Sequence, residues 1–204
     1  MDIHSTEQQQ EEKLKQLWQE YGVSVVSGIA LGLAGLGGWN YYSDIQVQKT
    51  QAASQEFQNI LENKEGTELV EAAQVYATNH SQQGYQALLN LSAAKVAVEA
   101  KDFSKAETLL AAVVAEGGFS GQIAALRLAR VQKHQAKYDD ALAELEKVSS
   151  ESFAAQKNEL KGDIYVDLKQ YSEAREAYQA ALAVQDINAA SAVQLKLDNL
   201  NSIS

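Results

Sequence analysis

The sequence of 204 residues contains no proline and no cysteine. Because proline interrupts helices and marks loops, its absence favours unbroken helices joined by short turns. The absence of cysteine excludes disulfides, thiolate metal sites, a cysteine nucleophile and a lipidated cysteine anchor. It suits an oxidising compartment without requiring one. No segment shows the alternating Val, Ile and Thr pattern of a strand, and helix-forming residues dominate after Asp44, so we predict an all-α protein.

Motifs that carry chemistry are also missing. The three histidines are isolated, and the sequence has no HExxH zinc motif, phosphate-binding loop or nucleophile elbow. Gly35, Gly37 and Gly38 lie inside an apolar run that we interpret below as a transmembrane helix. A phosphate-binding loop there would lie in lipid. We therefore expect no catalytic residue, no cofactor, no metal and no small-molecule substrate. The alternative, an enzyme with an unrecognised site, would be favoured by turnover without an added partner.

The formal net charge is −10. An acidic protein does not attract nucleic acid or anionic lipid, so we expect no nucleic-acid partner. A solvated helical surface explains most of these charges.

One stretch lacks charge altogether, from Tyr21 to Ser43. As a helix it would span roughly 34 Å, which exceeds the ~30 Å hydrocarbon core of a bilayer. Aromatic residues flank both ends, as they do at membrane interfaces; they are Trp18, Tyr21, Trp39, Tyr41 and Tyr42. We predict a transmembrane helix over residues 21–43, with a buried core helix as the alternative.

The apolar run is too long for a typical signal peptide core and no A-x-A-like site follows it, which favours an uncleaved signal-anchor. Lys13 and Lys15 before the run, against Lys49 after it, weakly favour a cytoplasmic N-terminus. We expect three parts: a cytoplasmic tail with a short amphipathic helix over 1–20, the anchor over 21–43, and a periplasmic domain over 44–204.

Small residues recur every four positions within the anchor. One row contains Ser24, Gly28 and Gly32, and the other contains Ala30, Ala34 and Gly38. Such rows let a second helix approach closely in lipid, which makes them candidates for transmembrane helix packing. Glycine is also common in membrane helices, so the rows have a purely compositional explanation as well.

A repeat follows the anchor. Ala72, Ala106, Ala141 and Ala174 are spaced 34, 35 and 33 residues apart, and Gly162, Tyr165 and Tyr178 add to the pattern of the last unit. A period near 34 with small residues where helices cross resembles the tetratricopeptide repeat, although the Trp and terminal Pro of that pattern are absent. The resemblance implies an α-solenoid of helical hairpins, and we expect a helix over residues 188–200 to cap its open end.

In tetratricopeptide stacks the first helix of each pair lines a concave groove. Counting back from Phe103, Tyr138 and Tyr171 gives the candidate partner-binding residues: Leu88, Leu91, Lys95, Val98, Ile123, Leu126, Arg130, Lys133, Gln156, Glu159, Asp163 and Val166. We expect an extended or helical partner segment with apolar anchors. The alternative is that Leu88, Leu91, Ile123 and Leu126 belong to the core.

Four stretches add a more specific resemblance: GIALGLAGLGGWNYY (28–42), AASQEFQNIL (52–61), LRLARVQ (126–132) and LKLDNLN (195–201). With the order of tail, single span and repeats, the chain resembles the YfgM family, the ancillary subunits of the bacterial SecYEG translocon. The resemblance implies an inner-membrane protein with periplasmic repeats. It also implies association with SecYEG and with the chaperone PpiD, and a role in passing translocating polypeptides to periplasmic folding factors. The alternative is a membrane-tethered scaffold for envelope assembly, cell division or stress-response regulation.

Overall fold

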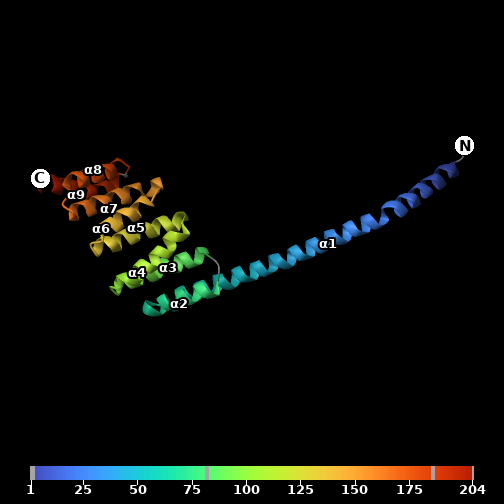
Figure 1. Cartoon of the computed structure of the whole chain (residues 1–204), viewed down its shortest axis with the longest axis horizontal. Coiled ribbons are helices and arrows are strands. Elements are labelled where there is room, and N and C mark those ends of the chain that lie inside the picture. Colours follow the sequence, from blue (N-terminus) through green and yellow to red (C-terminus); the bar gives the residue numbers. More distant parts are fainter. Residues whose placement is uncertain (1–2, 81–82, 185–186, 204) are drawn as a thin grey trace. The chain divides into compact units, whose positions relative to one another are not determined.

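The computed structural model describes residues 3–80, 83–184 and 187–203, and these form α-helices, one short 3₁₀ helix and no strand. The all-α prediction is therefore confirmed. The helices are α1 (Ile3–Asn63), α2 (Gly66–Asn79), α3 (Gln83–Glu99), α4 (Phe103–Glu116), α5 (Gly118–His134), α6 (Tyr138–Glu146), α7 (Ala154–Asp167), α8 (Tyr171–Ala183) and α9 (Ile187–Ile203) (Figure 1).

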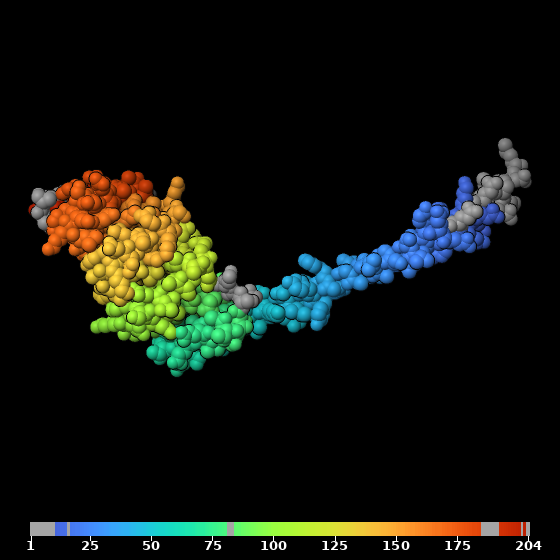
Figure 2. Space-filling view, in the orientation of Figure 1, coloured from blue at the N-terminus to red at the C-terminus, as the bar shows by residue number. Residues whose placement is uncertain are grey.

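The chain divides into two compact units, residues 1–52 and 53–204. The first unit consists of the larger part of α1, which runs without a break through the predicted tail and anchor. The side chains of the apolar stretch are uncovered by the described residues: Val23 is 81% exposed, Leu31 74% and Trp39 68%. In Figure 2 this stretch is a single helix wide. A segment of α1 from Leu17 onward is long and apolar enough to cross a membrane, by length and composition.

The second unit is a stack of antiparallel helix pairs. The end of α1 packs on α2, and the Tyr76 hydroxyl donates to the Ala53 carbonyl over 3.2 Å. The following pairs are α3 with α4, α5 with α6 and α7 with α8, and α9 packs against α8. The first helices of successive pairs also touch, α3 with α5 and α5 with α7. This arrangement is the tetratricopeptide-like solenoid that the repeat predicted, and α9 lies where the capping helix was expected.

The turns that join the two helices of a pair repeat the same backbone conformation in the last three pairs. Lys101, Ala136 and Lys169 all have a left-handed conformation, with φ of 62°, 57° and 61°. The backbone N–H of the residue that follows each of these donates to the carbonyl five positions earlier. In the second turn, for example, the Lys137 N–H donates to the Gln132 carbonyl over 2.9 Å. This is a Schellman-type helix end, which usually has glycine at the left-handed position. Here the repeated turn forms without glycine.

Fully buried alanines mark the places where paired helices cross. Ala106, Ala141 and Ala174 are 0% exposed, as the repeat predicted. In the first pair the register is shifted: Ala73 is fully buried, whereas the predicted Ala72 is only partly buried. The shift arises because the partner of α2 is the end of the long helix α1, so this pair does not share the turn geometry of the later pairs.

The core is continuous because α5 contributes to two clusters of buried side chains. Ala124, Leu128 and Val131 pack with α3 and α4, whereas Ala125, Leu126 and Ala129 pack with α6 and α7. A helix that packs on both sides keeps only a narrow exposed strip. The last cluster joins α7, α8 and α9 through Tyr178, Val193 and Leu197.

Gly162 allows a close approach between α7 and α8. A Cβ atom at this position would overlap the ring of Tyr178. That ring is buried, and its hydroxyl donates to Asp163 over 2.8 Å, so it has little freedom to move aside.

We therefore predict that Gly162→Ala destabilises the repeat unit by about 1–3 kcal/mol, as overpacking does. Gly84→Ala is the matched control, because nothing lies within 4 Å of its Cβ position and alanine favours the helix. Thermal unfolding followed by circular dichroism measures both effects. Equal melting temperatures for Gly162→Ala and the wild type would contradict the close-packing assignment.

Candidate functional site

Most of the predicted groove residues fall into three groups in the structure. Leu91 and Leu126 are core residues, with 7% and 4% of their surfaces exposed, and Ile123 packs partly against the core. The prediction that Leu91 and Leu126 line an open groove is therefore wrong. The physical reason is that α3 and α5 each have helical neighbours on both sides, so their buried faces are wider than one helical stripe. Leu88 and Val98 remain exposed, at 46% and 37%.

A second group of predicted groove residues forms ion pairs that join α5 to α7 and α7 to α9. Lys133 of α5 pairs with Asp167 of α7 over 2.8 Å. Glu159 and Asp163 of α7 both contact Lys196 of α9, at 2.8 and 2.7 Å. These side chains tie the stack together, so they are not free for a partner. On the same helix Gln156 is exposed, and Val166 packs partly against the last core cluster.

Lys196 of α9 lies in a polar cluster with Glu159 and Asp163 of α7 and Tyr178 of α8. Burial alone would lower the pKa of Lys196, but its hydrogen bonds with Asp163 and Glu159 outweigh this effect and raise that pKa. Burial, followed by the hydrogen bond to Asp163, also raises the pKa of the Tyr178 hydroxyl. The ammonium group lies 5.9 Å from the centre of the Tyr178 ring. Lys196 therefore fastens α9 to both helices of the last pair.

The sign of the Lys196 pKa shift sets the pH range of this interaction. Because the pKa in the folded chain is raised, the stabilisation is fully present below the ordinary lysine value of 10.5. It is lost as the pH rises through the raised value. The contact is thus intact at neutral pH.

We predict that Lys196→Met weakens the attachment of α9 by roughly 1 kcal/mol, since the pair is only partly buried. Faster hydrogen exchange should appear in α9 and not in α4. Lys169→Met is the control, because it changes charge in the turn between α7 and α8 without touching α9. Unchanged exchange in α9 would show that its apolar contacts alone hold it.

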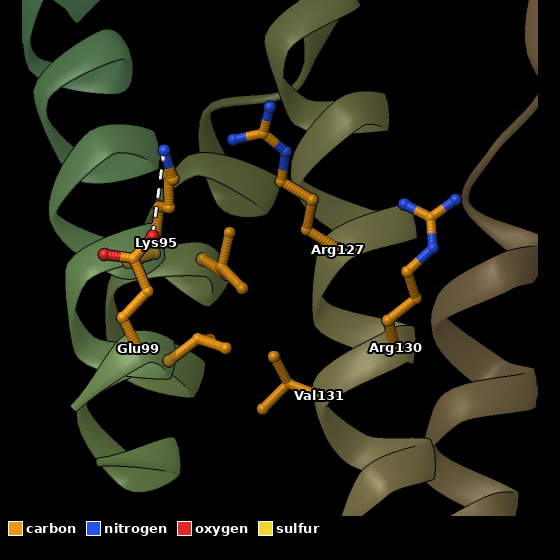
Figure 3. Close-up of a pocket in the computed structure, with 8 residues that line it drawn as sticks. Lys95, Glu99, Arg127, Arg130 and Val131 are labelled. Atoms are coloured by element: carbon orange, nitrogen blue, oxygen red, sulfur yellow. Dashed lines mark ion pairs between the residues drawn. The ribbon is translucent and has the colours of Figure 1, made fainter. Parts of the chain in front are cut away.

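The third group lines an open depression of about 340 Å3 between α3 and α5. Lys95, Val98 and Arg130 are there, as the sequence predicted, together with Arg127, which it missed. Figure 3 shows Lys95 and Glu99 on α3, opposite Arg127, Arg130 and Val131 on α5. We call this surface the basic depression. Among the predicted groove residues it gathers Lys95, Val98 and Arg130, whereas Leu88 and Gln156 are exposed but do not line it.

Arg127 was missed because counting back at the repeat's spacing selected Leu126 and Arg130. The actual exposed strip of α5 runs through Arg127 and Arg130, three residues apart, because Leu126 turns into the core. The available signal was an arginine between two leucines, Leu126 and Leu128, three positions before Arg130.

The predicted packing rows of the anchor lie on the surface of α1. Ser24, Gly28, Gly32, Ala30, Ala34 and Gly38 are all exposed, and no atom lies within 4 Å of a Cβ built on Gly28 or Gly32. The described residues cover none of these six, so both rows are accessible to another helix. Whether another helix uses them stays a prediction.

The fold defines a class, tetratricopeptide repeat-like proteins, and comparison with known proteins agrees. The family model described as "Tetratricopeptide repeat-like domain" matches residues 15–202. No solved structure matches the chain.

Several relatives are named "Ancillary SecYEG translocon subunit". The one from Aggregatibacter actinomycetemcomitans is 31% identical, covering 95% of this chain and 97% of the relative. Those from Haemophilus influenzae and Escherichia coli K12 are also 31% identical; the alignments cover 97% and 98% of this chain, and 99% and 100% of the relatives. The chain belongs to the family of ancillary SecYEG translocon subunits, which is the resemblance predicted from the sequence.

Proposed function

We propose that this chain is a non-enzymatic ancillary subunit of the SecYEG translocon in the bacterial inner membrane. The observation that carries the proposal is the pairing of an uncovered apolar helix with a repeat domain, in a chain related along nearly its full length to proteins of that name. The apolar helix anchors the chain as an uncleaved signal-anchor. The repeat domain binds other proteins and catalyses no reaction.

The proposed topology places the tail of residues 1–20 in the cytoplasm, the anchor of residues 21–43 in the membrane and the domain of residues 44–204 in the periplasm. The support is the lysine bias around the apolar stretch, with Lys13 and Lys15 on one side and Lys49 on the other. In this topology the repeat domain lies in the compartment into which translocated chains emerge.

The repeat domain, in this proposal, binds the periplasmic chaperone PpiD and helps to pass translocating polypeptides to folding factors. Support comes from the family resemblance and from the accessible surface of the basic depression. A stack of helix pairs offers an extended surface to a partner segment without requiring a rearrangement of its core.

The topology predicts a protease result. Protease added to spheroplasts should digest the repeat domain and leave a fragment that contains the anchor. In inverted membrane vesicles the domain should be protected. The reverse pattern would contradict the orientation.

The role predicts recovery of the SecYEG translocon when the tagged chain is purified in a mild detergent. Replacing Gly28 and Gly32 with leucine keeps the helix apolar but fills the uncovered small-residue row, so recovery should fall while membrane insertion persists. Loss of close packing changes helix association by about 1–2 kcal/mol in model peptides. Replacing Val25 and Ile29 with leucine is the matched control.

Absence of the translocon from the wild-type purification would contradict the proposed function and favour a separate envelope scaffold. Equal recovery with the Gly28 and Gly32 variant would leave the function intact and assign the contact to another face.

A further inference from the structure

The basic depression combines an apolar floor with a rim of cations. Ala94, Leu110 and Val131 line its floor and are buried, with 2%, 1% and 6% of their surfaces exposed. Val98 lies at its edge and is 37% exposed. A cavity of about 340 Å3 that is open to solvent suits one or two apolar side chains from another chain rather than an enclosed small molecule.

The rim cations are poorly neutralised, in contrast to other cations of the stack. Lys95 and Glu99 are 3.7 Å apart and their side chains are 74% and 63% exposed, so their attraction is weak. Arg127 reaches the Leu91 carbonyl only at 3.5 Å, the outer limit of a hydrogen bond. By comparison, Lys133 and Lys196 hold carboxylates at 2.7–2.8 Å.

Arg127 and Arg130 are both exposed on α5, and neither forms an ion pair within the described part of the chain. Guanidinium groups bind carboxylates through two parallel hydrogen bonds, which gives both strength and orientation. The chain as a whole is acidic, with a net charge of −10, so the sign of this local basic surface is opposite to that of the overall charge. A basic surface of this kind favours a partner segment whose negative charges lie together, where they can meet the two arginines.

We propose that the basic depression binds an acidic amphipathic segment of a partner protein. An aliphatic or aromatic side chain of that segment enters between Val98 and Val131, and its carboxylates pair with Arg127 and Arg130. The inference rests on the proposed function, because it specifies the partner chemistry for the same repeat domain. It also limits the working groove to α3 and α5, since Glu159 and Asp163 of α7 are held by Lys196.

A direct test measures peptide binding to the full chain in detergent by fluorescence anisotropy. The probe is a labelled helical peptide with leucine and phenylalanine on one face and glutamates beside them. A second peptide has lysine in place of every glutamate. The acidic peptide should bind, its affinity should fall with added salt, and the basic peptide should bind far more weakly.

Variants locate the site. Arg127→Glu with Arg130→Glu should weaken binding of the acidic peptide about tenfold or more, because two charge-assisted pairs become repulsive. Lys169→Glu is the control for charge, since Lys169 lies in the turn between α7 and α8. Val98→Gln should also weaken binding, whereas Val184→Gln, an exposed change directly after the end of α8, should not.

Equal binding of the acidic and basic peptides, absence of acidic-peptide binding, or full affinity in the double arginine variant with intact helicity would each overturn the inference. These failures are distinct from failure of the proposed function. A chain that recovers the translocon but ignores the acidic peptide refutes the partner chemistry alone. A chain that binds the peptide but never recovers the translocon refutes the role alone.

Discussion

Close contact at small side chains is the constraint on which the repeat unit depends. Ala106, Ala141 and Ala174 are completely buried where paired helices cross, and Gly162 lets α7 meet the Tyr178 ring on α8. A larger side chain at any of these places would push two helices apart and open the core on either side of them. Because α5 packs into two neighbouring clusters, such a displacement in one pair would reach the next. The geometry of the surface therefore depends on these crossings.

Ion pairs also hold α5, α7 and α9 together. Lys133 joins α5 to α7, and Lys196 joins α7 to α9. Cations along these helices thus neutralise the carboxylates of their neighbours within the stack. At the basic depression this pattern is incomplete, because α3 offers only Glu99, which faces Lys95 on its own helix. The accessible positive charge is a consequence of that missing carboxylate.

The fold could be predicted from the sequence because its determinants are local or periodic. The uncharged stretch, the spacing of the alanines and the closing helix each leave a direct pattern in the chain. The turns at Lys101, Ala136 and Lys169 left none, since glycine is absent where the backbone is left-handed. The surface was less predictable. Leu91 and Leu126 were groove candidates with the core as the alternative, and they belong to the core because α3 and α5 have neighbours on both sides. Lys196 and Asp163 form an ion pair although they are 33 positions apart, and no local sequence pattern predicts it.

We propose that this membrane-anchored repeat stack engages its partners through α3 and α5, while α7 and α9 hold the stack together. Hydrogen exchange of the full chain, alone and in the complex recovered with the translocon, tests this claim most directly. We expect added protection in peptides that cover residues 94–99 and 127–131, with little change in α8 and α9. Protection confined to α7, α8 and α9, with α3 and α5 unchanged, would contradict it.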